Sequence, residues 1–521
     1  MFRYVLKLKK IIFVELLISL IAVSCTTLIP LFEMNLIDSL QNGTFDVSFA
    51  IRLVIQFIIV ILVYCLTNYF SLVCDFKISA TFDKNVSIDF FHSLLNMKEK
   101  KFKKYSVGEY LSIFSNEIPQ LSSDYLVPII DNISSLLSIL ISCIVIFGFV
   151  DVKIGIILII TSLIAYLLSR FNNEKMSEKR KAYLDRLGSY VENLKAYLTG
   201  QYLFRKQSVE NAGKLHSKQQ DDILKKRMSY GRSKAFTLTY NGFLSYLMLI
   251  VVFISVVILF LMDEISIGVA VAAFGYVDAF FYPISGIINN LATIQSTKSI
   301  QTKLLGILED NEEKEMLLKP INKITCKDLS YSMGDKVIVN NVNLEFVRGS
   351  KIAIVGANGS GKSTLLNLIA RLIEPNQGEI LFDSVMIDEL SQVPDIAYIR
   401  QHDIILPVSF EDNVTMFGEY ELKKLERYGF KSYSVYQKIA KCDNCMNLSG
   451  GEKQFVSLCR AICSGAKILL MDESFSAVDA DTSANILKTL VEDETLTLLY
   501  ITHNQKELCL FKEVLDMGKI K

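Results

Sequence analysis

Nine consecutive residues of this 521-residue chain have the composition of a phosphate-binding loop. The segment fits the pattern G-x-x-x-x-G-K-[ST]. Its members are Gly356, Ala357, Asn358, Gly359, Ser360, Gly361, Lys362, Ser363 and Thr364. Glycines let the backbone approach a phosphate chain, and the N–H groups at a helix start point toward it. Lys362 would reach the β- and γ-phosphates of a nucleotide, and the Ser363 hydroxyl would hold Mg²⁺.

The segments on either side of this loop supply the context that the motif requires. Residues 351–355 are apolar and β-branched and predict a strand, whereas residues 365–372 predict a helix. A glycine-rich turn that arises by chance rarely has both a strand before it and a helix after it. The sequence therefore predicts an α/β domain that binds a nucleotide.

Two adjacent carboxylates end a second apolar segment, residues 468–473. Asp472 suits the shell of Mg²⁺, because a hard cation prefers oxygen ligands. Glu473 would then orient or deprotonate an attacking water. An acidic turn after a buried strand is common on its own. Following the phosphate loop along the same chain, it predicts the hydrolytic half of an ATP site.

A third segment, residues 448–454, places Ser449, Gly450 and Gly451 just before a predicted helix that ends near residue 465. A helix N-terminus with small residues is a second anion-binding end. This segment resembles the signature sequence of ATP-binding cassette (ABC) transporters. The resemblance covers essentially the whole chain, in the order of an exporter half-transporter: a membrane region with six spans, then one cassette.

The resemblance implies roles for four further positions. Tyr331 is similar to the aromatic residue that stacks on adenine, although a core tyrosine on an edge strand is the alternative. Gln401 is similar to the glutamine that senses Mg²⁺ and water, and His503 to the switch histidine on the γ-phosphate. Residues 476–479, which include Asp479, resemble the segment that bridges two cassettes and contributes to the ATP site.

The family sandwiches ATP and Mg²⁺ between the phosphate loop of one cassette and the signature of another. One chain carries one of each, so the resemblance implies a partner chain. Every matched position keeps a competent residue, which favours a homodimer with two working sites. A heterodimer remains open.

The membrane region is predicted from composition. Mean hydropathy is positive at +0.34, and 51% of the residues are hydrophobic. The 55 Lys and Arg balance the 55 Asp and Glu, so net charge gives no reason to expect a nucleic-acid partner. Six apolar stretches approach the length that crosses a bilayer. They are residues 11–32, 51–73, 126–150, 154–171, 244–262 and 267–293.

Charge placement predicts the orientation. Residues 33–51 carry acidic residues but, before Arg52, no Lys or Arg, whereas residues 74–125 and 172–240 are rich in them. Basic loops stay in the cytoplasm. We therefore expect a multi-pass protein of the cytoplasmic membrane with both termini in the cytoplasm, long helices projecting into it, and reduced thiols.

Two stretches predict contacts between cassette and membrane region. Residues 107–112 and 197–204 resemble the coupling helices of exporters, with ordinary turns as the alternative. Within the sixth span Asp278 is a costly carboxylate, so it indicates either a cavity that receives a cationic or polar substrate or an interhelical hydrogen bond. The neighbouring aromatic residues would line such a cavity or simply pack. They are Tyr276, Phe280 and Phe281.

The chain departs from the family pattern just before the signature. Residues 441–447 replace the usual Thr-x-x-Gly-Glu stretch and carry Cys442 and Cys445. Zinc would need four converging thiolates, and we do not expect it. No peptidase domain precedes the first span, so we do not expect the chain to cleave a leader peptide. The expected domains are residues 1–318 and 323–521.

The sequence therefore predicts a polytopic α-helical membrane domain of the exporter-type ABC fold, fused to an α/β P-loop cassette. Its expected function is ATP-hydrolysing export of a small molecule, peptide or lipid by a dimer. Three alternatives stay open: an importer on the same fold for a siderophore-like substrate, a membrane sensor or immunity ATPase that translocates nothing, and a cassette ATPase that acts on nucleic acid or ribosomes.

Overall fold

The computed structural model divides the chain into two compact units. The helical unit comprises residues 1–97 and 102–311, and the α/β unit comprises residues 98–101 and 312–521. The structure describes residues 1–43, 45–97, 99–309, 320–334, 336–386, 395–401, 403–475 and 480–519. Of residues 319–322, which separate the two expected domains, only residue 319 lies outside these ranges.

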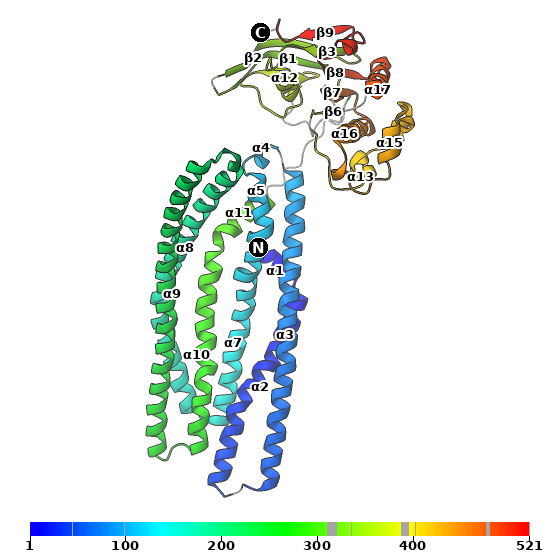
Figure 1. The fold of residues 1–521 in the computed structure, drawn as a ribbon. Helices are drawn as coiled ribbons and strands as arrows, with labels where there is room; N and C mark the ends of the chain where they lie inside the picture. The colour runs from blue at the N-terminus through cyan, green and yellow to red at the C-terminus, as the bar shows by residue number, and fades with distance from the viewer. Residues whose placement is uncertain are drawn as a thin grey trace. The chain divides into compact units, whose positions relative to one another are not determined.

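Long helices make up the helical unit (Figure 1). The α-helices are α1 (Phe2–Lys7), α2 (Lys9–Gln41), α3 (Val47–Asn96), α4 (Glu99–Phe102), α5 (Val107–Ser112), α6 (Ile118–Leu121), α7 (Val127–Val145), α8 (Val152–Thr199), α9 (Lys206–Leu261), α10 (Ile267–Ser296) and α11 (Lys298–Leu308). Short π-helical segments join α5, α6 and α7 into one continuous rod from Val107 to Val150, and a 3₁₀ turn at Gln201–Leu203 follows α8.

Each of the six predicted spans lies within one of these helices or rods, except that residue 262 follows the end of α9. Five described helices or rods are long and apolar enough to cross a membrane: α2, α3, the rod Val107–Val150, α9 and α10. The fourth predicted span lies in α8, whose described apolar part is Val152–Ala165. With 56 residues, α9 is roughly 84 Å long at 1.5 Å per residue. Such a helix extends well beyond a hydrocarbon core of about 30 Å.

Polar caps fix the turns between the spans. Asp46 caps α3 and Asp151 caps α8, each accepting hydrogen bonds from backbone N–H groups of the first turn. Asp38 of α2 accepts a hydrogen bond from the Gly268 backbone N–H at 2.9 Å. A Cβ on Gly268 would lie 2.4 Å from that carboxylate. Glycine therefore allows the N-terminus of α10 to meet α2.

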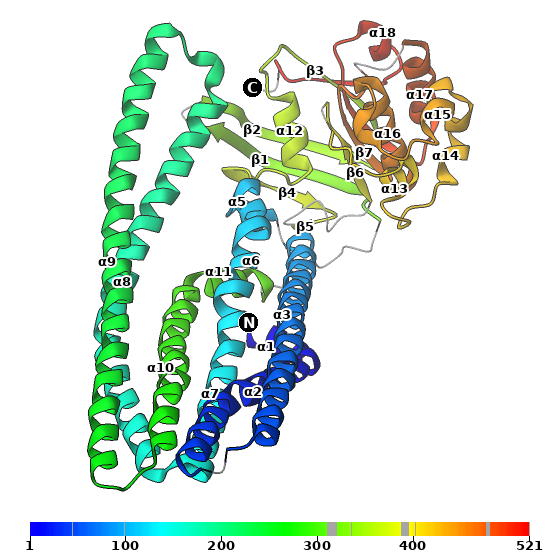
Figure 2. The same ribbon diagram turned by 60° about the horizontal axis from the view of Figure 1, so that its bottom comes forward.

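The helices pack in two groups of buried side chains. One group joins α1, α3 and the rod around Ile113, and the other joins α8, α9 and α10 around Tyr276. Helices α8 and α9 run side by side along their length in both ribbon views (Figures 1 and 2).

The α/β unit contains an antiparallel and a parallel sheet in its described residues. The antiparallel sheet has the order β2-β1-β4-β5 and the parallel sheet the order β6-β7-β8-β3-β9. Their strands are β1 (Lys323–Met333), β2 (Lys336–Val347), β3 (Lys351–Val355), β4 (Gln377–Phe382), β5 (Val385–Met386), β6 (Ile396–Ile399), β7 (Ile468–Asp472), β8 (Thr497–Ile501) and β9 (Glu513–Asp516).

The parallel sheet positions the site. Strands β7 and β8 are buried at every residue, as expected for a sheet covered on both faces. The described helices are α12 (Lys362–Ile369), α13 (Phe410–Thr415), α14 (Lys424–Arg427), α15 (Ser434–Ile439), α16 (Gly450–Ser464), α17 (Ala480–Glu492) and α18 (Gln505–Leu508). The carboxyl ends of the parallel strands share one edge, where ligands bind in such folds.

Candidate functional site

The phosphate loop runs from the end of β3 to the start of α12, as the sequence predicts. Gly361 has φ 97°, a left-handed conformation, and a Cβ there would lie 3.0 Å from the Ile338 carbonyl. Only glycine fits this turn without strain. The Lys362 ammonium is buried inside the loop and donates hydrogen bonds to the carbonyls of Gly356 and Ala357 at 2.9 and 3.1 Å. A cation is thereby fixed at the helix N-terminus, where phosphate oxygens bind.

Asp472 and Ser363 meet beside the loop. Burial raises the pKa of the Asp472 carboxyl above its usual value, and the hydrogen bond with Ser363 acts in the opposite direction. A buried carboxylate next to a hydroxyl is a set of hard oxygen donors, which fits Mg²⁺. Ser360, also in the loop, has a buried hydroxyl with no hydrogen-bond partner among the described residues. The Ser360 hydroxyl is thus available to form a hydrogen bond with a bound ligand.

Glu473 forms the centre of the candidate hydrolytic group. Its carboxylate accepts a hydrogen bond from the Gln401 amide at 2.9 Å, and its other oxygen lies 3.3 Å from His503 Nε2. Gln401 follows β6, Glu473 follows β7 and His503 follows β8. The structure therefore brings together three predicted residues that are far apart in the chain.

The backbone of Glu473 is in a sparsely populated conformation. Its φ is 47°, and its N–H donates to the Ile501 carbonyl at 3.2 Å. A non-glycine residue with positive φ costs roughly 1–3 kcal/mol and is retained where the surroundings fix it. This conformation points the carboxylate to the sheet edge while Asp472 stays buried.

Neighbouring side chains hold the two partners of Glu473. Gln454 of α16 donates to the Gln401 carbonyl at 3.2 Å. On the other side, Glu507 accepts hydrogen bonds from the Thr502 hydroxyl and, at 3.2 Å, from the Asn504 amide, on either side of His503. Sequence reasoning missed these supporting residues, because no motif spacing connects them with the site.

The signature segment begins α16. Ser449 caps this helix by accepting a hydrogen bond from the Glu452 N–H, and Glu452 accepts one from the Ser449 N–H at 2.8 Å. Lys438 pairs with Glu452 at 2.6 Å. The Lys438 contact and the bonds from Ser449 lower the pKa of Glu452 to about 2. The Ser-x-x-Glu spacing of a capping box could have revealed Glu452 from the sequence.

This cap gives a testable expectation. We expect Glu452→Ala to lower ATP hydrolysis several-fold, because losing a capping interaction costs about 1 kcal/mol and frees the signature backbone. ATP binding to the phosphate loop should stay within about twofold of the wild type. The pKa of the Glu452 carboxyl is lower in the folded protein than in the unfolded chain. The ionised carboxylate therefore stabilises the folded protein above about pH 4.5, and this contribution is lost only as the pH falls toward 2. A pH profile of hydrolysis between 6 and 8 should therefore show no step from this residue.

Two other predicted ATP-site positions are less defined. Tyr331 lies on β1 opposite Val339 of β2, half-buried beside the apolar core. Strand β1 is an inner strand, between β2 and β4, and a half-buried side chain there is compatible with either stacking or packing. Asp479 and the rest of residues 476–479 lie outside the described residues.

The predicted substrate residues in α10 separate into different environments. Tyr276 is fully buried and donates a hydrogen bond to the Thr27 carbonyl at 2.7 Å, and Phe280 is also buried. Both pack between helices, as in the packing alternative, and their role at a substrate cavity stays a prediction. Asp278 lies on the exposed side of the helix. A membrane helix is apolar all round, so its sequence did not indicate which face packs.

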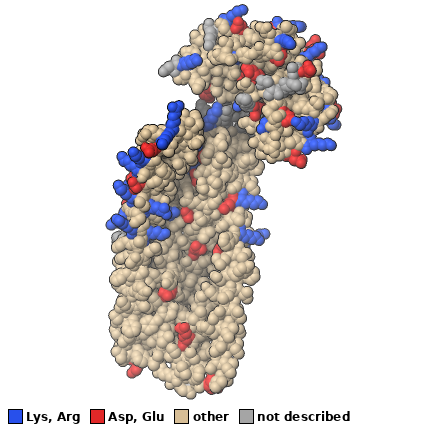
Figure 3. All heavy atoms as spheres, in the orientation of Figure 1, with Lys and Arg blue, Asp and Glu red and all other residues tan. Residues whose placement is uncertain are grey.

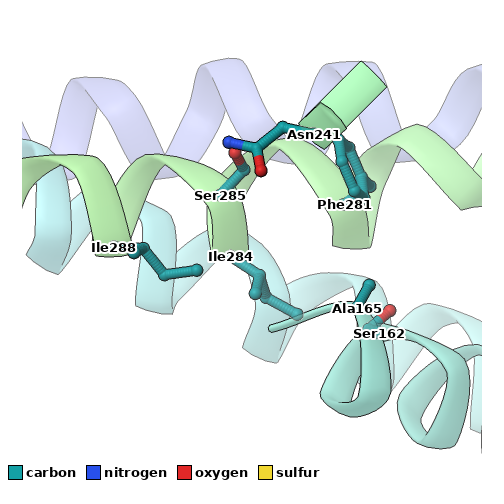
Figure 4. A pocket seen from close by; sticks show the side chains of 7 residues that line it. All are labelled: Ser162, Ala165, Asn241, Phe281, Ile284, Ser285 and Ile288. Carbon is teal, nitrogen blue, oxygen red and sulfur yellow. The ribbon is translucent and has the colours of Figure 1, made fainter. Parts of the chain in front are cut away.

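Phe281 does line a water-sized pocket of about 10 Å³ between α8, α9 and α10 (Figure 4). Asn241 of α9 is 8% exposed, and its amide oxygen has no hydrogen-bond partner among the described residues. The pocket walls are Ser162, Ala165, Asn241, Phe281, Ile284, Ser285 and Ile288. A cavity of this volume holds about one water.

The predicted coupling segments are surface helices and turns. Residues 107–112 form α5, which Ser106 and Glu109 close with a capping box. Residues 197–204 contain the 3₁₀ turn after α8, where Tyr202 and Leu203 are exposed. The coupling role stays a prediction.

Four cysteines lie near the signature in the α/β unit, and Cys442 is half-buried against its core. Cys445 is fully buried, and burial together with the neighbouring Cys442 raises its thiol pKa to about 11. Cys459 and Cys463 are buried within α16. Cys445, Cys459 and Cys463 therefore pack in the core of the α/β unit.

Comparisons with known proteins decide the family. A family model described as ABC transporter transmembrane region matches residues 12–284, more than half of the 521 residues, and one described as ABC transporter matches residues 339–476. The chain belongs to the ABC transporters. The transporter's two matched regions are the helical unit and the α/β unit, in that order.

Individual relatives agree with this assignment. The transporter is 24% identical over 465 residues to proteins called ATP-dependent lipid A-core flippase from Escherichia coli K12 and Shigella sonnei, covering 84% of this chain and 79% of each relative. Its fold matches the structure of a bacterial Atm1-family ABC exporter with ATP bound, with TM-score 0.70 at 16% identity over 98% of this chain and 94% of the other. The predicted fold class is confirmed. The transporter is an ATPase that couples hydrolysis to movement across a membrane.

Proposed function

We propose that two copies of this chain form an ATP-driven exporter with two composite ATP sites. The observation that carries the proposal is the meeting of Gln401, Glu473 and His503 at the edge of the parallel sheet, beside a loop that holds Lys362. This is a hydrolytic arrangement, and it is fused to membrane-spanning helices. In this proposal, ATP hydrolysis at the α/β unit drives a conformational change in the membrane-spanning helices.

In this proposal each residue has one task. The phosphate loop and Lys362 bind the β- and γ-phosphates of ATP. Glu473 orients the attacking water and accepts its proton, Gln401 fixes that carboxylate, and His503 contacts the γ-phosphate. Ser363 and Asp472 would hold Mg²⁺, which would neutralise phosphate charge there.

The signature of one chain completes the site of the other. Ser449 and the backbone of Gly450 and Gly451 open α16, where a helix N-terminus attracts phosphate. Because the chain carries one competent copy of each half, a symmetric homodimer supplies two complete sites. Closing the cassettes around ATP then moves the helical units, and hydrolysis resets them.

The orientation follows from charge. On the visible face of the helical unit, Lys and Arg gather toward the upper end of the long helices (Figure 3). The lower end carries isolated acidic residues. Basic residues stay on the cytoplasmic side. We therefore place both termini and the α/β unit in the cytoplasm, with α5 and the turn at Gln201–Leu203 as coupling elements.

Vesicle transport tests this function. Liposomes carrying the protein with its α/β unit outside would receive ATP and a mixture of cellular small molecules, and the lumen would be analysed by mass spectrometry. The proposal expects compounds that accumulate with wild-type protein but not with Glu473→Gln. ATP-driven release of preloaded compounds instead would identify an importer. Hydrolysis with neither movement would favour a sensor ATPase and overturn the proposal.

Tyr331 supplies a separate prediction. If its ring stacks on adenine, Tyr331→Ala should weaken ATP binding about fivefold to tenfold, consistent with roughly 1 kcal/mol for one aromatic contact. Tyr331→Phe should bind normally, because the ring is kept. Isothermal titration with ATP and with inorganic triphosphate separates the cases. Equal loss for both ligands in Tyr331→Ala would show a packing role instead.

A further inference from the structure

Cys442 and Cys445 form a C-x-x-C pair just before the signature, and the proposed function gives their thiols no task. The Cys442 Sγ lies 3.2 Å from the carbonyl oxygen of Asn444. That carbonyl belongs to the planar peptide unit that also contains the Cys445 nitrogen. The Cys442 sulfur therefore lies beside the peptide bond that leads into Cys445.

The backbone holds both cysteines against one short segment of the chain. The Phe410 N–H donates to the Cys442 carbonyl at 2.9 Å, and the Cys445 N–H donates to the Val408 carbonyl at 3.0 Å. Val408 and Phe410 are two residues apart, which limits their separation to about 7 Å. The chain also bends at Asp443. The bend and the two hydrogen bonds keep the C-x-x-C stretch from extending.

The two thiols differ in their access to solvent. Cys445 is fully buried, whereas Cys442 is half-buried. Burial raises the pKa of the Cys445 thiol to about 11, and the charge of Cys442 and a hydrogen bond with its side chain act in the same direction. Cys445 is therefore protonated at neutral pH and shielded. An oxidant would react first at Cys442, with Cys445 beside the product.

A redox role fits this pair better than a metal site does. Within the ranges that the structure describes, no group of three or more His, Cys, Asp or Glu side chains could hold a metal ion. Two thiolates alone do not make the four-coordinate site that zinc requires. In the proposed orientation the pair lies in the cytoplasm, where disulfides are usually transient and serve in redox sensing or catalysis.

The pair is joined directly to the signature. Cys445 begins the 3₁₀ turn Cys445–Asn447, and the Leu448 N–H donates to the Cys445 carbonyl at 3.3 Å. Ser449, which caps α16, is the next residue. A covalent bond between the cysteines would restrain this turn. It would thereby restrain Ser449, which in the proposed function contacts the nucleotide bound to the partner chain.

We propose that Cys442 and Cys445 form a redox switch, in which a peroxide joins them in a disulfide that slows ATP hydrolysis and a dithiol reductant restores it. The proposal adds regulation to the ATP site and rests on the proposed function, in which the signature completes a composite site. The disulfide itself can be detected without ATP turnover.

The oxidation balances in two steps. The Cys442 thiolate attacks one oxygen of hydrogen peroxide and breaks the O–O bond, which gives a sulfenic acid and a hydroxide that takes up the former Cys442 proton as water. The Cys445 sulfur then attacks the Cys442 sulfur, and the S–O bond breaks. The leaving hydroxide takes the Cys445 proton and departs as a second water. Two thiols thus lose two electrons, and one peroxide is reduced to two waters.

The test uses full-length protein in lipid nanodiscs that is reduced, freed of reductant and treated with an equimolar amount of hydrogen peroxide. Mass spectrometry detects the disulfide as a loss of two hydrogens from the peptide that contains residues 442–445. We expect ATP hydrolysis to fall at least about fivefold as the disulfide forms, and dithiothreitol to reverse both changes. Cys442→Ser should hydrolyse ATP normally in both conditions, because it cannot form the bond.

Cys509→Ser is the control variant, because Cys509 is an exposed cysteine of the α/β unit outside the pair, and it should respond to peroxide as the wild type does. Equal loss of hydrolysis in Cys442→Ser would overturn the proposal. A disulfide that leaves hydrolysis unchanged, or no disulfide between these two residues, would also overturn it. If Cys442→Ser fails to fold, Cys442→Ala carries the same comparison. Reduced wild-type protein that hydrolyses no ATP would instead count against the proposed function, while the peptide masses would still test the disulfide.

Discussion

Glu473→Gln should bind ATP with near wild-type affinity and hydrolyse it at least about a hundredfold more slowly, since a positioned general base contributes about 10²–10⁴-fold. The amide keeps the size of the side chain and can still contact Gln401, which lies 2.9 Å from the carboxylate. It cannot accept a proton from water. The variant should therefore accumulate in an ATP-bound state.

Single-turnover hydrolysis and a nucleotide-binding titration measure the two halves of this expectation. Glu494→Gln, an acidic residue in the turn before β8, is the control and should hydrolyse ATP normally. Turnover of Glu473→Gln within a few-fold of the wild type would remove Glu473 from its assigned role.

The second large effect concerns which chain completes the site. Lys362→Ala should abolish phosphate binding by the phosphate loop. Gly450→Asp should place a negative charge at the signature, where it would repel phosphate. A Cβ on Gly450 meets no atom within 4 Å, so this variant is expected to fold. As homodimers, both variants should lose nearly all hydrolysis, because every composite site contains one defective half.

Mixed dimers isolated with two affinity tags distinguish the arrangements. If sites form between chains, pairing Lys362→Ala with Gly450→Asp leaves one intact site and restores up to about half of wild-type hydrolysis. Pairing the wild type with a chain that carries both substitutions leaves no intact site. If each chain held a complete site by itself, these two mixed dimers would show the reverse pattern.

Short sequence motifs correctly predicted the secondary-structure elements that carry the candidate ATP site. The phosphate loop, the strand that ends at Asp472 and the helix that begins after Ser449 lie where their motifs place them. Residues 107–112 likewise form α5. These features depend on neighbours in the chain, such as glycine turns, caps and short apolar runs.

Contacts between distant segments could not be predicted in this way. The hydrogen bond between Gln401 and Glu473 requires the order of strands β6 and β7 in the sheet, and the strained φ of Glu473 requires the surrounding fold. In the membrane helices, sequence-based prediction of contacts fails for another reason. Apolar residues surround each span on all sides, so periodicity does not distinguish the buried Tyr276 from the exposed Asp278.

ATP bound at the α/β unit should change the conformation of the membrane-spanning helices. Hydrogen–deuterium exchange of Glu473→Gln in nanodiscs, with and without ATP and Mg²⁺, measures this directly along the whole chain. We predict that ATP changes exchange both in residues 351–364 and in peptides from α2, α9 and α10. Changes confined to the α/β unit, with the helical unit exchanging identically in both states, would contradict the account.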